Sequence, residues 1–371
     1  MSLANSNERA YAMSDNQRVY CKVKNHLKKM MPAQPQGHVV TLAMMIVGII
    51  CGKKAQLGPM SNEVPYGSKD DSVERRMRRW VGNQRIGTNV YFMPFAQALL
   101  VGLAHRPLVL VMDGSPVGRG CMALIVGVVY QRRVLPLAWL VYKGKKGHAP
   151  ATRHQEVLEL VKPLIPAQST VILLGDGEYD TPEMLTWVDT QTTWFFVSRT
   201  AANILVSTVS EEWFALSTWN LQPGDLQVAA EARFTQRKAA GPYLVIGWWD
   251  AQHDEPLYLV TNFTDAQEAI YWYSKRYRIE TFFSDQKSRG FHIHKSHLSD
   301  PARLARLLIA ACLAYIWIIY LGVTALQTHQ ADLIDRNDRC DLSLFQMGLR
   351  WLTHLLKWRK PLPIAFRVPL G

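Results

Sequence analysis

The sequence predicts an α/β protein in which helices cover a mixed β-sheet. Its 371 residues are 48% hydrophobic and 19% charged, which is the composition of a folded chain with a large core. Between residues 107 and 198, three apolar runs follow one another directly, and further runs then alternate with helical stretches. Adjacent strands joined by short turns pair antiparallel, whereas βα units add parallel strands, so this order predicts a mixed sheet.

Residues 1 to about 95 are predicted to be helical. The expected segments are residues 16–31, 39–51, 55–63 and 72–80. The last of these, SVERRMRRW, has Ser72 as a plausible N-cap and carries Arg75, Arg76 and Arg79. A helix, a turn and an arginine-rich helix are typical of a small DNA-binding module, and the alternative is a solvated basic helix.

The strands of the predicted sheet are apolar runs rich in β-branched residues. They cover residues 108–113, 121–130, 134–142, 170–176 and 193–198. One helix is expected at 151–162, and a second opens at Asp180, which forms a D-x-x-E capping box with Glu183. The predicted order is therefore β-β-β-α-β-α-β.

Residues 199–263 break this rhythm with several short strand candidates separated by turns such as QPGD and AAGP. They predict a β-rich insertion before one long helix at 265–289. Two more helices are expected, at 300–323 and 342–358.

An apolar run of seventeen residues, 307–323, lies at the low edge of the length that spans a membrane. Arg303 and Arg306 precede it at helical spacing, and the sequence has no second comparable run. These features favour a buried core helix over a membrane span.

The net charge of +12 favours a polyanionic partner, nucleic acid before membrane. The five cysteines are scattered and none forms a CxxC pair, which argues against a disulfide framework and against a zinc site. We therefore expect a protein of a reducing cytoplasm.

Four polar residues of the predicted helix 265–289 share one face. Arg276, Glu280 and Lys287 follow Tyr273 by 3, 7 and 14 positions, which places all four within an arc of about 60° on a continuous helix. Such a face suits the binding of a phosphate backbone around a metal-binding carboxylate. The alternative is a solvated charged helix with i,i+4 ion pairs.

Asp113 and Asp176 each end a predicted buried strand. Carboxylates at the ends of adjacent strands can converge, and Glu280 on a helix over that edge would add a third. Oxygen ligands of this kind select Mg²⁺ or Mn²⁺, and two such ions about 4 Å apart would activate an attacking oxygen and stabilise a leaving one. The alternatives are that Asp113 is a turn residue, that Glu178 or Asp180 takes the place of Asp176, and that Glu280 is a surface charge.

The two aspartates and the four helix residues resemble those of the DDE transposases of bacterial insertion sequences. The spacing Y-x2-R-x3-E-x6-K resembles the signature of the "IS-four" group and matches it at every position. The resemblance covers roughly residues 105–325. One departure is Gly177-Glu178-Tyr179, where many relatives have Arg-Gly-Phe after the aspartate, and it puts the role of residue 178 in doubt.

This resemblance implies a ribonuclease H-like fold interrupted by a β-rich insertion, and metal-dependent cut-and-paste transposition at terminal inverted repeats. It implies that Glu280 completes a metal site with Asp113 and Asp176, and that Tyr273, Arg276 and Lys287 hold phosphates near the scissile bond. In relatives that cut through a DNA hairpin, a tryptophan of the insertion stacks on a flipped base. Trp248 and Trp249 are the candidates here, and the alternative is that they are core residues of the insertion.

The expected organisation follows. A helical N-terminal DNA-binding domain (1–95) precedes a catalytic core (96–198 and 264–325), which is interrupted by the insertion domain (199–263) and followed by a C-terminal helical region (326–371). DNA, two Mg²⁺ ions, for which Mn²⁺ can substitute, and a second copy of the chain are expected, the last because two DNA ends must be paired. The expected DNA contacts are Tyr273, Arg276, Lys287, Trp248, Trp249, Arg75, Arg76, Arg79, Arg119 and Lys145. A catalytically inactive, transposase-derived DNA-binding protein is the alternative function.

Overall fold

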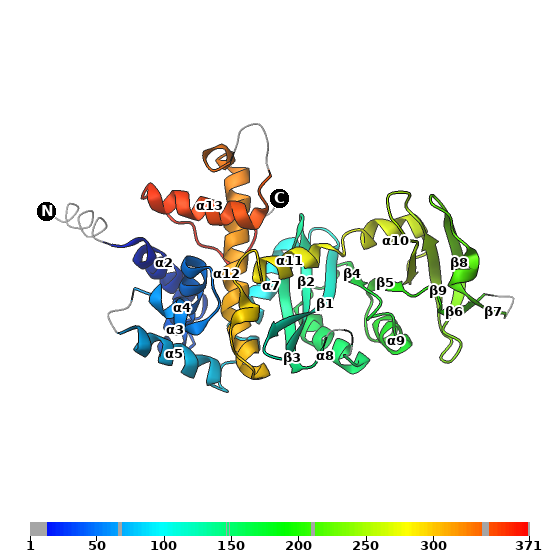
Figure 1. Cartoon of the computed structure of the whole chain (residues 1–371), viewed down its shortest axis with the longest axis horizontal. Coiled ribbons are helices and arrows are strands. Elements are labelled where there is room, and N and C mark those ends of the chain that lie inside the picture. The colour runs from blue at the N-terminus through cyan, green and yellow to red at the C-terminus, as the bar shows by residue number, and fades with distance from the viewer. Residues whose placement is uncertain are drawn as a thin grey trace.

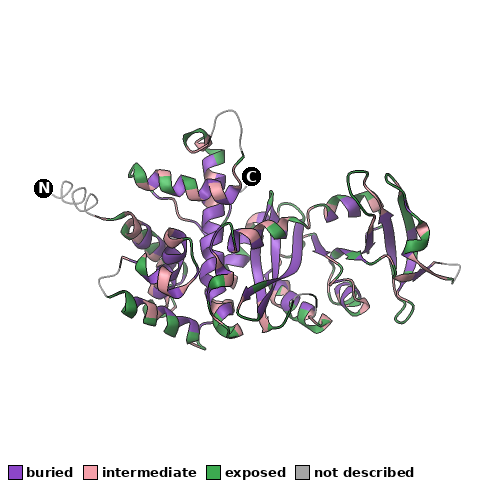
Figure 2. Ribbon diagram, in the orientation of Figure 1, coloured by how far each residue is buried: buried purple, intermediate pink, exposed green. Residues whose placement is uncertain are grey.

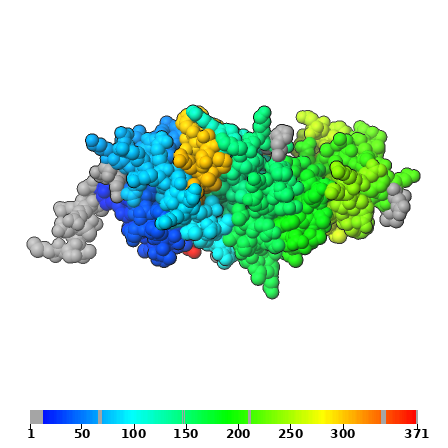
Figure 3. Space-filling model, turned by 90° about the horizontal axis from the view of Figure 1, so that it is seen from below, coloured from blue at the N-terminus to red at the C-terminus, as the bar shows by residue number. Residues whose placement is uncertain are grey.

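The structure is a computed structural model that describes residues 13–65, 69–145, 147, 149–208, 212–335 and 341–369. The first twelve residues of the expected N-terminal domain, and residues 336–340 of the expected C-terminal region, lie outside the described residues. The molecule is elongated, with a group of helices at one end, a long helix beside them, and a sheet that runs to the other end (Figure 1). Seen from below, the N-terminal helices and the β-rich end lie at opposite ends of the surface (Figure 3).

The helices and strands have the following bounds. The N-terminal helices are α2 (Asp15–Met30), α3 (Gln36–Gly52), α4 (Leu57–Asn62), α5 (Asp70–Gly82), α6 (Thr88–Tyr91) and α7 (Met93–Leu103). The strands are β1 (Leu108–Gly118), β2 (Cys121–Tyr130), β3 (Arg133–Lys143), β4 (Val171–Gly175), β5 (Phe195–Thr200), β6 (Leu205–Ser207), β7 (Trp213–Ala215), β8 (Leu226–Phe234), β9 (Ala240–Trp248) and β10 (Leu257–Thr261). The later helices are α8 (Ala151–Val161), α9 (Pro182–Gln191), α10 (Ala266–Tyr273), α11 (Arg278–Gln286), α12 (Pro301–Gln327) and α13 (Leu344–Lys357).

The N-terminal helices follow from their apolar spacing and their caps. Helix α2 buries Val19, Val23 and Leu27, which recur every fourth residue on one face, and Ser14 caps it by accepting a hydrogen bond from a backbone N–H. The predicted arginine-rich helix is confirmed, but Ser72 as its N-cap is wrong. Helix α5 begins two residues earlier, because Asp70 and Asp71 occupy its first turn, where carboxylates complement the helix dipole.

The described strands form one ten-stranded sheet with the order β3-β2-β1-β4-β5-β10-β9-β8-β6-β7. Strands β1 to β3 are antiparallel neighbours, and β4 and β5 are parallel to β1. The predicted mixed sheet covered by helices is therefore confirmed. Figure 1 draws α10 and α11 above the strands and α8 and α9 below them.

The strands expected between residues 199 and 263 are also present. They join the same sheet, because β10 returns to pair antiparallel with β5 and carries β9 and β8 on its other edge. The backbone hydrogen bonds therefore continue from the predicted core into the predicted insertion.

Helix α12 is the centre of the helical part. It has 27 residues, and by length and composition it is the one helix among the described residues that could cross a membrane. Within the molecule, however, 89% of its most apolar window is buried, and it packs against α3, α5, α6, α13 and β3 (Figure 2). Arg306 ties its first turns to the N-terminal helices by donating to the carbonyls of Val81 and Ile86. The predicted buried core helix is confirmed.

Two glycines allow α12 and α13 to approach closely. A Cβ atom on Gly348 would overlap the carbonyl oxygen of Ile318, and one on Gly322 would overlap the carbonyl oxygen of Leu344. The backbones of the two helices are therefore in direct contact at this crossing.

The predicted continuous helix at 265–289 is wrong. Helix α10 ends at Tyr273 and α11 begins at Arg278, and the residues between them form turns with i→i−3 hydrogen bonds such as Arg276 N–H to Tyr273 O. The hydroxyl of Ser274 also bonds the carbonyl of Tyr271 at 2.7 Å. These shorter bonds change the helical phase, so the arc expected for one straight helix does not apply.

The predicted cap at Asp180 is also wrong. Thr181 caps α9 by accepting from the N–H of Met184 at 3.4 Å, and Pro182 follows in the first turn, where its missing N–H costs nothing. Burial of the Asp180 side chain instead raises the pKa of this carboxyl to about 6.

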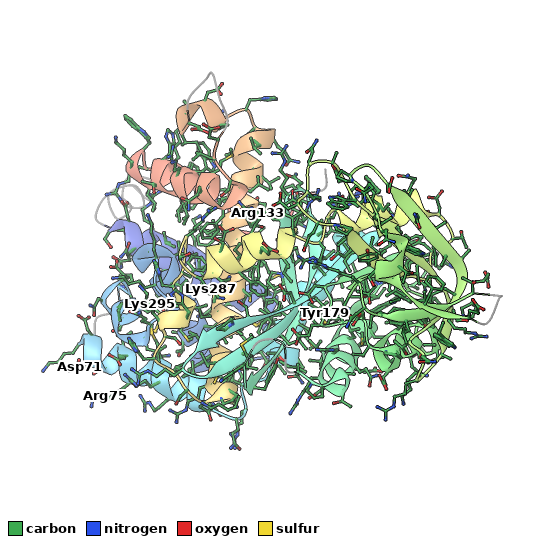
Figure 4. All side chains as sticks on the ribbon, turned by 45° about the vertical axis from the view of Figure 1, so that its right-hand side comes forward. Asp71, Arg75, Arg133, Tyr179, Lys287 and Lys295 are labelled. Atoms are coloured by element: carbon green, nitrogen blue, oxygen red, sulfur yellow. The ribbon has the colours of Figure 1, made fainter. Side chains whose placement is uncertain are left out.

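A buried ion pair fastens α11 to the sheet. Arg133 at the start of β3 lies 3.1 Å from Asp285 of α11, and the two side chains are only 10% and 3% exposed. Figure 4 labels Arg133 beside α11. This contact sets the position of the helix that carries Glu280.

Candidate functional site

Strand pairing brings Asp113 and Asp176 to the same level of the sheet. Val111 of β1 pairs with Leu174 of β4 in parallel register, and each aspartate follows its paired residue by two positions. Strand β4 ends at Gly175, whereas β1 continues to Gly118, so Asp113 lies within a strand and does not end one as predicted. The two carboxylates therefore leave neighbouring strands side by side.

Local hydrogen bonds hold both aspartates. Asp113 is 3% exposed, and its Oδ1 accepts the N–H of Gly114 at 2.6 Å. Asp176 is half-buried, and its Oδ1 accepts the N–H of Glu178 at 3.0 Å. Each carboxylate thus keeps a fixed orientation next to its own backbone.

Arg276 links these aspartates to Glu280. Its Nη2 lies 3.2 Å from Oε1 of Glu280, and its side chain is 19% exposed. Burial would lower the pKa of Arg276, but the neighbouring Tyr273, Asp176, Asp113 and Glu280 outweigh burial and raise it. The guanidinium therefore lies within electrostatic reach of all three predicted metal ligands.

The donor set suits a hard divalent cation, because these ligands offer carboxylate oxygens only. Glu280 is nevertheless 62% exposed and is paired with Arg276. Among the described residues, no group of three or more histidine, cysteine or acidic side chains is placed to hold a metal ion. The sharing of ions by Asp113, Asp176 and Glu280 stays a prediction.

Tyr273 and Lys287 lie before and after α11, respectively. Tyr273 ends α10, and burial raises the pKa of its hydroxyl to about 12, although the positive charge of Arg276 opposes this. Lys287 follows the last turn of α11, with its Nζ 5.8 Å from the ring centre of Phe283. In Figure 4, Lys287 lies toward the N-terminal helices, whereas Tyr179 lies among the strands. The structure gathers Tyr273, Arg276 and Glu280, and the role of Lys287 stays a prediction.

Two open hollows adjoin this group. The first, of about 650 Å³, is bordered by Asp176, Glu178 and Tyr258, and the second, of about 830 Å³, by Trp248 and Tyr273. Both hollows share the residues Arg199, Glu255, Pro256 and Arg276. A ligand that reaches Asp176 can therefore also reach the ends of strands β9 and β10.

Sequence reasoning missed Arg199 and Glu255, which lie between the two hollows. Arg199 Nη2 is 3.0 Å from Glu255 Oε1. The available signal was the place of Arg199 near the end of β5, a strand parallel to β4, since the ends of parallel strands share one edge of a sheet.

The structure distinguishes the two tryptophans. Trp248 ends β9 and lines the second hollow with Tyr273 and Arg276. Trp249 donates its indole N–H to the carbonyl of His253 at 2.9 Å and is not among the residues that line this hollow. Trp248 is the tryptophan that adjoins the site.

The remaining predicted DNA contacts lie elsewhere. Arg75 and Arg79 are exposed on α5, on the far side of α12 from the strands, whereas Arg76 donates to Thr41 Oγ1 at 2.8 Å and thereby joins α5 to α3 (Figure 1). Arg119 and Lys145 are exposed. Sequence spacing therefore grouped arginines that have different structural roles.

A mixed sheet with level carboxylates and neighbouring cations is compatible with chemistry on phosphodiesters. The family described as "Transposase DDE domain" matches residues 107–317, and the chain belongs to this family. The matched range contains both aspartates, Glu280 and the strands β1 to β10.

Solved structures similar to this chain include the cryo-EM structure of a piggyBac transposase synaptic complex with hairpin DNA. It shares 10% identity at a TM-score of 0.44, and the match covers 92% of this chain and 79% of that one. The crystal structure of human ENDOV shares 17% identity at a TM-score of 0.28, with 55% of this chain and 97% of that one covered. No curated protein matches the chain.

Proposed function

We propose that this chain is an active DDE transposase that cuts and joins DNA at terminal inverted repeats by a cut-and-paste route. The observation that carries the proposal is the level placement of Asp113 and Asp176 on neighbouring parallel strands, with Arg276 in reach of both and of Glu280. The strand order β3-β2-β1-β4-β5 supports a ribonuclease H-like core. Within that core, residues 199–263 would act as the insertion domain.

Asp113, Asp176 and Glu280 would hold two Mg²⁺ ions, for which Mn²⁺ would substitute. The bound ions would supply Lewis-acid stabilisation of the attacking and leaving oxygens. Glu280 occupies the first turn of α11, which the pair Arg133–Asp285 fixes on β3. The protein thereby presents its third carboxylate from a helix whose position is set by the sheet.

The cations and the buried phenol would bind the DNA backbone. Arg276 and Lys287 neutralise phosphate charge, and the protonated hydroxyl of Tyr273 donates to a phosphate oxygen. Because Arg276 already contacts Glu280 at 3.2 Å, a phosphate that binds Arg276 would lie directly beside the carboxylates. These residues would orient the scissile bond.

Trp248 would receive an extruded base if cleavage passes through a hairpin. It lines a hollow of about 830 Å³ together with Tyr273 and Arg276, so a base could stack there while its phosphate meets the cation. Extruding a base costs a few kcal/mol, and stacking on an aromatic ring offsets about 1–3 kcal/mol. Trp248→Ala should impair this step more than Trp249→Ala.

Other surfaces would extend the DNA contact. The exposed Arg75 and Arg79 on α5 would bind duplex phosphates within an N-terminal DNA-binding domain, and Arg119 and Lys145 would add contacts near the sheet. Two copies of the chain would pair the two transposon ends. The protein would act on chromosomal DNA in the cytoplasm of a bacterial or archaeal host.

The test uses DNA that carries the cognate ends, identified as short inverted repeats flanking the coding region. We expect Mg²⁺-dependent nicking followed by joining to target DNA, and loss of both in Asp113→Ala and Glu280→Ala. Glu159→Ala on α8, whose side chain is 54% exposed, is the matched control and should retain activity. Full cleavage by either site variant would refute the proposal.

The alternative is an inactive, transposase-derived DNA-binding protein. It is favoured by the ion pair Arg276–Glu280, which engages the third carboxylate. A purified protein that binds the ends but cleaves them neither in Mg²⁺ nor in Mn²⁺ would support this alternative.

A further inference from the structure

The hydroxyl of Tyr179 is a buried polar group without a hydrogen bond. Tyr179 is 2% exposed and follows Asp176 by three residues on the turn after β4. Its oxygen has no hydrogen-bond partner among the described residues. Buried hydroxyls are nearly always bonded, because leaving one unpaired is unfavourable, so this group calls for an explanation.

The Tyr179 ring is held firmly in place. It packs edge to face on the fully buried His154, with ring centres 4.6 Å apart. A Cβ atom added at Gly175 would lie only 2.8 Å from the Cβ of Tyr179, so the strand end leaves no space for the ring to shift. The position of the hydroxyl is therefore set by packing.

The Tyr179 hydroxyl reaches the edge of the sheet that carries Asp113. A Cβ atom on Gly114, the residue after Asp113, would lie 3.9 Å from the hydroxyl oxygen. Burial raises the pKa of Tyr179 well above its usual value, and among the charges Asp113 contributes most, ahead of Glu178 and Asp176. The phenol thus stays protonated and can satisfy a nearby carboxylate only by donating.

We propose that Tyr179 is a positioning residue whose O–H donates a hydrogen bond to the Asp113 carboxylate when that carboxylate holds a metal ion. This inference rests on the proposed metal-dependent function. Carboxylates that bind metals are themselves hydrogen-bonded by surrounding groups, which fix their orientation and tune affinity. The Tyr179 hydroxyl, which has no hydrogen bond among the described residues, would be that donor.

The chain offers a matched control in Tyr315 of α12. It is fully buried, its hydroxyl has no hydrogen bond within the described part of the chain, and it too lies near a carboxylate, that of Asp285. Tyr315→Phe therefore removes the same kind of group as Tyr179→Phe, but next to an aspartate that is not among the proposed metal ligands.

Both phenylalanine variants should be at least as heat-stable as the wild type without metal, since each loses an unsatisfied hydroxyl. Only Tyr179→Phe should weaken Mn²⁺ binding, by about tenfold or more, as measured by isothermal titration calorimetry on the full chain. It should also raise, by a similar factor, the Mg²⁺ concentration that gives half-maximal cleavage. Unchanged Mn²⁺ affinity in Tyr179→Phe, equal weakening in Tyr315→Phe, or a less stable metal-free Tyr179→Phe would overturn the inference.

Asp113→Ala separates this inference from the proposed function. If Asp113→Ala abolishes Mn²⁺ binding while Tyr179→Phe does not weaken it, the positioning role fails and the metal site stands. If Asp113→Ala binds Mn²⁺ as the wild type does, the metal site itself fails, and the role of Tyr179 fails with it.

Discussion

The close crossing of α12 and α13 makes Gly348 a sensitive glycine to test. In Gly348→Ala the new Cβ would overlap the carbonyl oxygen of Ile318 and lie 3.0 Å from its Cγ2. The carbonyl belongs to the backbone of α12, which is buried around this point, so it has no room to withdraw. The two helices must separate, or the α12 backbone must bend.

The expected cost follows from this geometry. Overpacking a core costs about 1–3 kcal/mol when side chains can adjust, and here the obstacle is backbone, so we expect about 3 kcal/mol. At about 2.1 cal/mol/K of unfolding entropy per residue, a chain of 371 residues then loses roughly 4 °C in Tm. Gly322→Ala, which would overlap the carbonyl of Leu344, should fall in the same range.

Differential scanning calorimetry of the purified variants measures the effect. Gly37→Ala in the first turn of α3 is the control, because nothing lies within 4 Å of the added Cβ. It should raise stability by about 0.4–1 kcal/mol through the less flexible unfolded chain. A Gly348→Ala protein that melts with the wild type would show that the helices are not in backbone contact.

The other predictions concern charged groups. Arg75→Ala should leave stability unchanged but lower the slope of log Kd against log salt for duplex DNA by about 1. Arg76→Ala should lower the free energy of unfolding by about 1 kcal/mol, because the guanidinium of Arg76 donates to Thr41. Equal effects of the two variants on DNA binding in anisotropy titrations would contradict this. Because burial raises the pKa of Asp180 to about 6, the folded protein binds this proton more tightly than the unfolded chain, and the stability contributed by this group is lost as pH rises from about 4 through 6. Asp180→Asn should therefore gain stability over the wild type in urea unfolding as pH increases, and a gain that shrinks with pH would be the opposite result. Asp285→Leu should cost roughly 3–5 kcal/mol by leaving Arg133 buried without its partner, and the double variant Arg133→Met/Asp285→Leu should recover most of that loss; no recovery would mean that the ion pair is not what holds α11.

Most of the structure that could be predicted followed from local patterns in the sequence. The apolar runs that form β1 to β5 are continuous and rich in β-branched residues, so the sequence predicted their lengths and the turns between them. The alternation of strands and helices predicted which strands run parallel. Parallel neighbours bring their ends to one edge, so the partnership of Asp113 and Asp176 followed from the sequence. Their placement at the same level of the sheet depends on the register of Val111 with Leu174, and no local sequence pattern encodes that register.

The break between α10 and α11 had no clear sequence signal. Residues 274–277 contain neither glycine nor proline, and the change to i→i−3 hydrogen bonds depends on Ser274 bonding its own turn. The pairing of β10 with β5 was equally hidden, because it joins strands about sixty residues apart. Arg199 and Tyr179 gained their places from such distant contacts, and spacing alone did not single them out.

The burial of α12 also limits how the chain can be divided. One side of this helix is covered by α3, α5 and α6, which all precede the sheet in sequence. A fragment that starts at β1 would lack these helices. It would expose that side of α12 as a continuous apolar surface whose length matches the thickness of a bilayer. Such a fragment would insert into lipid or aggregate with its own copies, so the N-terminal helices serve as a cover that keeps a membrane-like segment in water.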